Sequence, residues 1–277
     1  MVTTLQSAGH TVSVVLPHIQ RSWVGKAHLI GQTLTPSYFR PGTLHEDNGV
    51  ISTTPDKDGE EEWTLIDGTP ASCVQIGLAH LFQDRGPVDL VLSGPNYGRN
   101  STAVFSLSSG TIGGAMEGAV CGKKAIALSY AFDSRVHEPE IIAAASDVSR
   151  RLIEKLVREW PEPPTDIHLY SINVPLRTGV ESTKIMYTKI LQNRWTSASA
   201  FEQIEVDVDI DGNPVKHRKE LSEGDDNLTN GMQEIRSVTP AKLKQYKWAP
   251  VIKEVYDSVT QAGPGSDGWA LTEGTIR

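Results

Sequence analysis

The chain has 277 residues, of which 38% are hydrophobic and 22% charged, and its formal net charge is −8. This is the composition of an ordinary globular protein, long enough for one large domain or for one domain with an elaborate extension. The acidic balance argues against general binding to nucleic acid or to an anionic membrane, because both favour basic surfaces. A small anionic ligand that binds at a locally positive site is still compatible with the acidic net charge.

The apolar segments and the cysteines bear on localisation. No apolar run approaches the length needed to cross a bilayer, and no basic-then-apolar leader opens the chain. The two cysteines, Cys73 and Cys121, are too few for a disulfide framework and favour a reducing compartment. We therefore expect a cytoplasmic protein without a membrane span.

Apolar strands and amphipathic helices alternate along most of the chain. A short helix over residues 1–8, closed by Gly9, leads into a strand over 11–16. Further strands are expected at 63–66, 88–92, 124–129 and 167–175, and further helices at 69–82, 110–121 and 138–160. This alternation predicts a Rossmann-like, doubly wound α/β sheet.

The pattern changes after about residue 180. Residues 201–218 alternate between apolar and polar side chains and contain a turn signal at Asp211-Gly212, which predicts a β-hairpin. Residues 220–231 are polar and read as a loop. We expect an α/β core over residues 1–180 and a C-terminal extension over 181–277 that carries the hairpin and elements for oligomerisation.

Two polar segments follow strands of the predicted sheet, at the edge where open α/β sheets bind their ligands. "PHIQRSWVGKAH" follows the strand that ends at Leu16, and "SGPNYGRN" follows the strand that ends at Leu92. Asparagine and serine oxygens are hard donors suited to magnesium or manganese, although they are weak ligands without carboxylates. By composition alone, Pro95–Gly98 reads as a plain turn rather than as a site.

A second feature lies close by in the sequence, where Ser108-Ser109-Gly110-Thr111 precedes a helix of small residues. The free backbone amides at a helix N-terminus favour an anion such as phosphate, and Gly110 lets a ligand approach the backbone closely. The alternative is a serine or threonine N-cap and nothing more. The residues alone favour neither the phosphate site nor the simple N-cap.

Several ordered blocks resemble the SurE family of metal-dependent phosphatases: "VVLPHIQRS", "IDGTPASCVQIGL", "DLVLSGPNYGRN", "SSGTIGGAMEG" and "KAIALSYA". The resemblance runs from about residue 9 to residue 175, and "AGPGSDGWALTEG" resembles a late segment of the family. "RSWVGKAHLIG" and "WTLIDGTPASC" look most like the fungal branch, in which a SurE-like domain can be fused to a tubulin-tyrosine-ligase-like domain.

The resemblance implies a Rossmann-like fold, a homo-oligomer formed through the C-terminal extension, and removal of phosphate from nucleoside monophosphates or related phosphomonoesters. It also implies a divalent metal ion, magnesium or manganese. Carried over by position, the metal ligands are Ser22 and Asn96, and the catalytic residues are Asn96 and Ser109. The phosphate-binding residues are then Asn100, Ser109, Gly110 and Thr111.

The chain departs from the family at both ends. The family's Asn-Asp-Asp-Gly motif, whose two Asp hold the metal, and its final Ser-Val-Thr-Pro-Leu strand have no counterpart here. We therefore expect a truncated chain with weak or no turnover. The alternative is a non-catalytic nucleotide-binding or scaffolding domain that keeps the SurE fold. A dehydrogenase domain is disfavoured, because the glycine spacing of "GTIGGAMEG" does not fit the dinucleotide fingerprint.

Overall fold

The computed structural model describes residues 1–44, 46, 48–56, 61–132, 138–163, 165–197, 199–208 and 241–277. Contacts divide the chain into two units, residues 1–194 together with 255–277, and residues 195–254. Residues 255–277, which the sequence places in the extension, thus belong to the unit that contains the core. The domain boundary expected at residue 180 stays a prediction.

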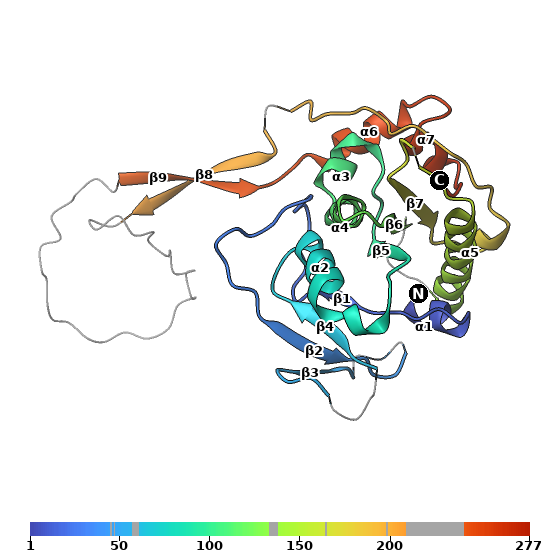
Figure 1. The fold of residues 1–277 in the computed structure, drawn as a ribbon. Helices are drawn as coiled ribbons and strands as arrows, with labels where there is room; N and C mark the ends of the chain where they lie inside the picture. Colours follow the sequence, from blue (N-terminus) through green and yellow to red (C-terminus); the bar gives the residue numbers. More distant parts are fainter. Residues whose placement is uncertain are drawn as a thin grey trace, which may run out of the picture. The chain divides into compact units, whose positions relative to one another are not determined.

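The first unit contains two sheets (Figure 1). One has the order β1-β4-β2-β3, with bounds Val15–Pro17, Trp63–Ile66, Pro36–Arg40 and Val50–Ser52. In it, β1 and β4 are parallel and the other pairs antiparallel. The other sheet is parallel, with the order β5-β6-β7 and bounds Leu90–Tyr97, Lys124–Ala131 and Leu169–Pro175.

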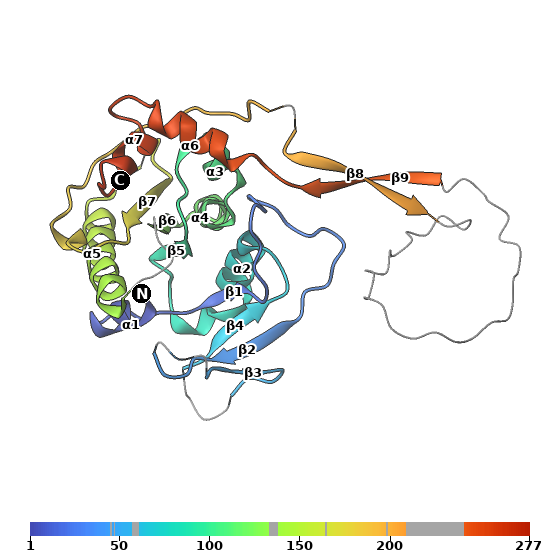
Figure 2. The same cartoon turned by 180° about the vertical axis from the view of Figure 1, so that it is seen from behind.

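Helices cover these sheets and complete a Rossmann-like α/β fold, which confirms the predicted fold class. Their bounds are α1 Val2–Ser7, α2 Pro70–Ile76, α3 Thr102–Ser108, α4 Gly110–Val120, α5 Pro139–Arg158, α6 Ile252–Thr260 and α7 Asp267–Thr272. The turn after α2 is π-helical over Gly77–Leu81, and short 3-10 turns occur at Gln83–Arg85 and Val180–Ser182. Figure 2 shows α7 beside β7.

Alternation along β6 decides which helix covers which face of the parallel sheet. Ile126 and Leu128 pack in one cluster with Leu152 of α5, whereas Ala125 and Ala127 pack with Ala115 of α4. Figure 1 shows α4 and α5 on either side of β6. Because β6 presents only alanines to α4 in this cluster, the helix can lie close to this strand.

The start of α4 is held against the segment that follows β1. The Gly25 N–H donates to the Ser108 carbonyl at 2.9 Å, and a Cβ on Gly113 would collide with the Gly25 backbone. A glycine at position 113 therefore allows a backbone-to-backbone contact. This contact brings the loop that carries Ser22 to the N-terminus of α4.

Several predicted elements are confirmed, but the first strand is shorter than expected. β4 has the predicted bounds, and α4 and α5 agree with the prediction to within two residues at each end. In contrast, Thr11–Val14 lie outside β1, and the three residues of β1 are only half-buried. The reason is that, among the described strands, β1 lies at the edge of its sheet and not in its centre.

Pro95–Gly98 does not form the plain turn that its composition favours. β5 continues to Tyr97, and after a register shift Asn96 and Tyr97 pair with Ser129 and Tyr130 of β6. Pairing with the neighbouring strand outweighs the local turn preference of Pro, Asn and Gly. The elements α3, β2, β3, β9 (Ala241–Trp248), α6 and α7 were not predicted from the sequence.

The second unit contains a hairpin, although not the one predicted. β8 (Phe201–Val208) pairs antiparallel with β9 (Ala241–Trp248), so that Phe201 faces Trp248 and Glu205 faces Lys244. The expected pairing of residues 201–208 with the residues after a turn at Asp211-Gly212 is therefore wrong. The turn itself lies outside the described residues.

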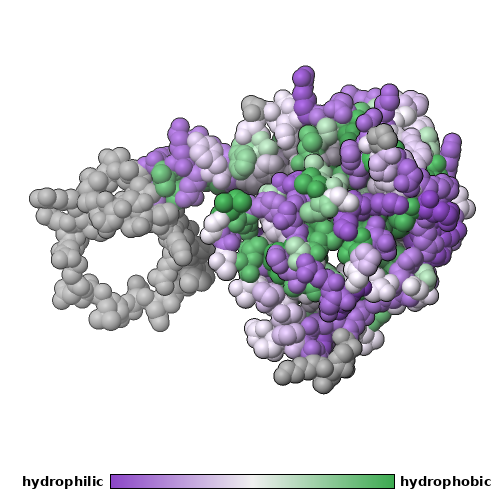
Figure 3. All heavy atoms as spheres, viewed as in Figure 1, coloured by the Kyte–Doolittle hydropathy of each residue, from purple (hydrophilic) through white to green (hydrophobic). Residues whose placement is uncertain are grey.

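Within the described residues, no helix combines the length and apolar character needed to cross a bilayer. Figure 3 shows hydrophilic and hydrophobic residues interspersed on the face seen in Figure 1.

Candidate functional site

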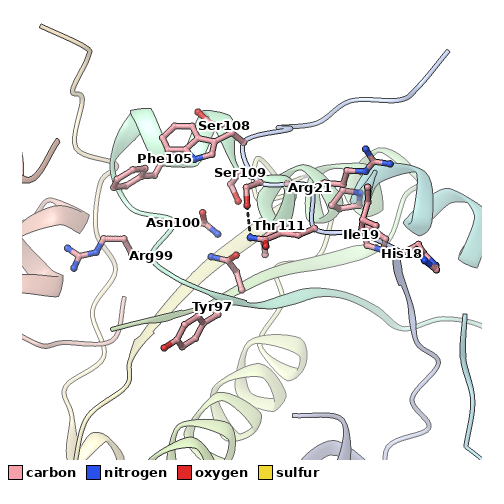
Figure 4. Close-up of a pocket in the computed structure, with 17 residues that line it drawn as sticks. His18, Ile19, Arg21, Tyr97, Arg99, Asn100, Phe105, Ser108, Ser109 and Thr111 are labelled. Atoms are coloured by element: carbon pink, nitrogen blue, oxygen red, sulfur yellow. Dashed lines mark hydrogen bonds between the residues drawn. The ribbon is translucent and has the colours of Figure 1, made fainter. Parts of the chain in front are cut away.

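One pocket of about 450 Å³ contains all six residues that the sequence analysis singled out (Figure 4). These residues are Ser22, Asn96, Asn100, Ser109, Gly110 and Thr111. The rest of the lining consists of Pro17, His18, Ile19, Gln20, Arg21, Trp23, Pro70, Tyr97, Arg99, Phe105 and Ser108. The loop after β1, the end of β5 and the start of α4 therefore meet at one place, and the roles of the six residues stay predictions.

Asn96 and Ser22 present oxygen atoms to this pocket. The Asn96 Nδ2 donates to the Gly98 carbonyl at 3.0 Å, which fixes the carboxamide and leaves its Oδ1 for a ligand. The Ser22 Oγ accepts from Gln20 Nε2 at 2.7 Å and lies on an exposed stretch of the loop. Both groups are neutral at any ordinary pH.

The N-terminus of α4 provides hydrogen-bond donors. The Ser109 Oγ accepts from the Ile112 N–H at 3.1 Å, so Ser109 is the N-cap of this helix. The backbone N–H groups of Gly110 and Thr111 have no acceptor within the helix, as is general for a first turn. The Ser109 hydroxyl proton also remains available, because capping uses only the oxygen as acceptor. The two interpretations of the sequence are therefore compatible.

Asn100 is buried and held on three sides. Its N–H donates to Asn173 Oδ1 at 2.8 Å, and its Nδ2 donates to Ser129 Oγ at 2.8 Å. Its carbonyl accepts from Arg277 Nη2 at 2.9 Å. One side-chain N–H remains for a ligand, and its direction is fixed because the rest of the residue is already bound.

Asp267 and Arg277 support the segment that follows Asn100. The Asp267 Oδ2 accepts from the Thr102 N–H and from Arg277 Nη1, both at 2.9 Å, while its Oδ1 accepts from the Leu191 N–H at 2.8 Å. Thr102 is fully buried with φ of 69°, a strained conformation that needs such support. Burial lowers the pKa of Arg277 to about 10, against the opposing effect of Asp267, so the guanidinium stays charged at neutral pH.

The pocket lining is positively charged although the chain is acidic. Arg21 and Arg99 line it, and within the described part of the chain the lining contains no Asp or Glu. Arg21 Nη2 is oriented by Asp67 Oδ1 at 2.6 Å, and the Arg99 guanidinium lies 5.1 Å from the ring centroid of Tyr256. Neither arginine was predicted from the sequence as a site residue. Arg21 precedes Ser22 and Arg99 precedes Asn100 in the sequence, and this proximity to two predicted site residues could have identified them.

Lys26 and His28 anchor the loop to α4 from outside the pocket. Lys26 Nζ lies 2.5 Å and His28 Nε2 3.4 Å from Glu117 Oε2, and Gln75 Nε2 donates to Glu117 Oε1 at 2.6 Å. Burial raises the pKa of the Glu117 carboxyl, but the hydrogen bonds from Lys26 and Gln75 outweigh burial and hold the pKa below its ordinary value. Of the two histidines near the loop, His18 lines the pocket and His28 does not.

The described lining of the pocket offers few of the ligands that a divalent metal ion prefers. Magnesium and manganese prefer carboxylates, whereas the lining offers the neutral oxygens of Ser22 and Asn96. Across the described part of the chain, no group of three or more His, Cys, Asp or Glu side chains could hold a metal ion. The described lining by itself therefore does not fit a tightly held divalent ion, and the metal roles of Ser22 and Asn96 stay predictions.

Comparison with protein families places most of the chain in one group. Residues 1–197 match the family described as "Survival protein SurE". A protein of Saccharomyces cerevisiae with the name "Probable tubulin--tyrosine ligase PBY1" is 36% identical over 288 residues, which cover 96% of this chain and 34% of that protein.

Bacterial relatives are similar over a shorter stretch. A "5'-nucleotidase SurE" from Ruegeria pomeroyi is 38% identical over 147 residues, which cover 52% of this chain and 55% of that protein. Another from Chlorobium phaeobacteroides is 34% identical over 149 residues, which cover 54% and 52%. The chain thus spans about a third of the yeast relative and about half of the bacterial ones.

A solved structure shows the same fold. The "Crystal Structure of Sure Protein from Aquifex aeolicus" superposes with a TM-score of 0.57 at 23% sequence identity, covering 99% of this chain and 83% of that one. At this identity the likeness concerns the fold alone.

Proposed function

The chain belongs to the SurE family, and on this premise we propose that its pocket binds the phosphate of a nucleoside monophosphate or related phosphomonoester for hydrolysis. The family and the relatives named 5'-nucleotidase support a phosphatase- or nucleotidase-type function. The single observation that carries the proposal is that Asn96, Asn100 and the start of α4 line one pocket together with Arg21 and Arg99.

The residues of this pocket would bind and orient the phosphate. Its oxygens accept from the N–H groups of Gly110 and Thr111 and from the Ser109 hydroxyl, at the positive end of the α4 dipole. These donors are fixed before the ligand arrives, so they stabilise negative charge as it grows in the transition state. Asn96 is the second proposed catalytic residue. It orients the phosphate ester relative to Ser109.

The proposed cofactor is magnesium or manganese, with Ser22 and Asn96 as two neutral ligands. Carboxylate ligands would have to come from outside the described lining, which contains none. We therefore propose that this chain binds the ion weakly and hydrolyses its substrate slowly.

The second candidate function is a nucleotide-binding domain without turnover, and it rests on the donors for a phosphate that the described lining offers. Two measurements separate the two candidates: AMP binding by isothermal titration calorimetry in EDTA, and phosphate release from AMP and p-nitrophenyl phosphate with manganese. Release that requires metal and falls in Asn96→Ala supports the hydrolase. AMP binding without phosphate release supports the second candidate. If the chain neither binds AMP nor releases phosphate, both candidate functions are contradicted.

We propose in addition that the chain forms a homo-oligomer through its extension. The hairpin of β8 and β9 leaves the side chains of Phe201, Tyr246 and Trp248 exposed, and a lone two-stranded hairpin is marginally stable in water. Light scattering coupled to size-exclusion chromatography tests this. A monomeric mass at micromolar concentration would contradict the proposal.

A further inference from the structure

Trp23 lines the pocket in a backbone conformation that suits glycine. It follows Ser22 directly, and its φ is 62°, in the left-handed region that large side chains rarely adopt. A bulky residue stays in this region only where its surroundings hold it there, and such residues cluster at ligand sites. The strain therefore raises the question of what the indole does in the pocket.

The position of Trp23 is fixed by its neighbours. Its ring packs against Phe105 of α3 with centroids 5.7 Å apart and planes at 64°. The loop backbone is held two residues later by the hydrogen bond from Gly25 to Ser108. The residue nevertheless remains 36% exposed and lines the pocket, so part of its surface is open to a ligand.

Phe105 of the aromatic pair lies about one helical turn before the proposed phosphate position. Phe105 precedes Ser109 by four residues, which corresponds to about 6 Å along α3. Figure 4 shows Phe105 and Arg99 on one side of Asn100 and Ser109, and His18 on the other side. A ligand that reaches from the start of α4 to the aromatic pair must carry a spacer between its phosphate and its ring.

We propose that Trp23 is a specificity-determining residue, which together with Phe105 forms an aromatic wall that selects phosphomonoesters bearing a nucleobase. This inference rests on the proposed function and names the part of the site that recognises the leaving group. A nucleobase presents a flat π-face, and the ribose supplies the spacer. In phosphotyrosine, by contrast, the ring is bonded directly to the ester oxygen, so it would stay near Ser109.

The test measures dissociation constants for AMP, glycerol 3-phosphate, phosphotyrosine and inorganic phosphate by calorimetry in EDTA. Trp23→Gly removes the ring and places glycine where the backbone favours it, so we expect the variant to fold with an unchanged thermal midpoint. Its affinity for AMP should fall about tenfold, the usual contribution of one stacking aromatic side chain. Its affinity for inorganic phosphate should stay within about twofold, because the phosphate contacts remain.

Two further variants control the experiment. Trp23→Phe keeps a ring and should retain most of the preference for AMP. Tyr187→Ala removes an exposed aromatic side chain outside the pocket and should change no affinity.

The outcomes separate this inference from the proposed function. Equal losses for all four ligands in Trp23→Gly, or equal affinities of the unaltered chain for AMP and glycerol 3-phosphate, overturn the inference and leave phosphate binding intact. Phosphotyrosine binding as tight as AMP binding overturns the assignment to a nucleobase. No binding of any of the four ligands overturns the proposed function itself and the inference with it.

Discussion

Asp267 and Arg277 form a buried ion pair, with 2.9 Å between Oδ2 and Nη1, and the same guanidinium donates to the carbonyl of the pocket residue Asn100. The pair thus joins α7 to the segment that continues from β5 into α3. The floor of the pocket depends on residues that are more than 160 positions away in the sequence.

Removing the guanidinium should destabilise the fold and weaken the site. In Arg277→Met, the buried Asp267 carboxylate keeps only neutral donors, and the Asn100 carbonyl loses a partner. We expect the free energy of unfolding to fall by about 3–5 kcal/mol, measured by urea denaturation.

The control for this variant is Arg151→Met. Arg151 pairs with Asp147 on the surface of α5, where its side chain is more than half exposed, so the loss should stay below about 1 kcal/mol. Equal shifts of the urea midpoint in the two variants would show that the ion pair does not support the fold as described.

A methyl group on Gly113 should displace the loop that carries Ser22. The Cβ of Gly113→Ala would collide with the Gly25 backbone, which cannot move without shifting the loop away from α4. We expect AMP affinity to fall about tenfold or more, as measured by calorimetry. Gly263→Ala is the matched control, because its Cβ would meet open space. An unchanged affinity in Gly113→Ala would mean that the loop position does not matter for binding.

Glu117 should make stability depend on pH. Because its folded-state pKa lies below the ordinary value of 4.5, its contribution is present above pH 4.5 and is lost as the pH falls through the folded-state pKa. Glu117→Gln cannot titrate and loses the ion pair with Lys26, so it should be less stable by about 1–3 kcal/mol at pH 7.

The measurement is the urea midpoint of both proteins from pH 7 to pH 3. The difference between the unaltered chain and Glu117→Gln should shrink below pH 4.5, since the advantage of the carboxylate disappears there. A difference that stays constant over the whole range would contradict the assignment of a lowered pKa to Glu117.

Local sequence patterns predicted the elements whose partners are also local or strongly apolar. The β-branched and apolar runs of β4 and β6, and the small residues of α4, are sufficient to identify those elements. The predictions were wrong where the structure of a segment depends on pairing with a strand that is distant in the sequence. Asn96 belongs to a strand because of Ser129, and β8 pairs with β9 across more than 30 intervening residues.

In the candidate site, too, some residues could be predicted from the sequence, whereas others are brought together only by the fold. The resemblance identified residues that line one pocket, from Ser22 to Thr111, although their roles remain untested. It did not identify Asp267 and Arg277 as supports, because only the fold brings them to Asn100. The strain at Trp23 was equally hidden, since backbone dihedral angles are not visible in a sequence.

The central claim is that the start of α4 binds a phosphate, and Thr111→Asp tests it most directly. An acidic residue in the first turn of a helix interacts favourably with the dipole, so the fold should be as stable as before or gain about 0.3–1 kcal/mol. The added carboxylate would nevertheless repel a phosphate at the same place. Pro139→Asp adds the same charge to the exposed first turn of α5 and is the matched control.

The measurement is the dissociation constant of AMP in EDTA for these two variants and the unaltered chain. We predict that Thr111→Asp loses AMP binding while its thermal midpoint is maintained, and that Pro139→Asp binds AMP like the unaltered chain. Undiminished AMP affinity in a folded Thr111→Asp variant would contradict the account.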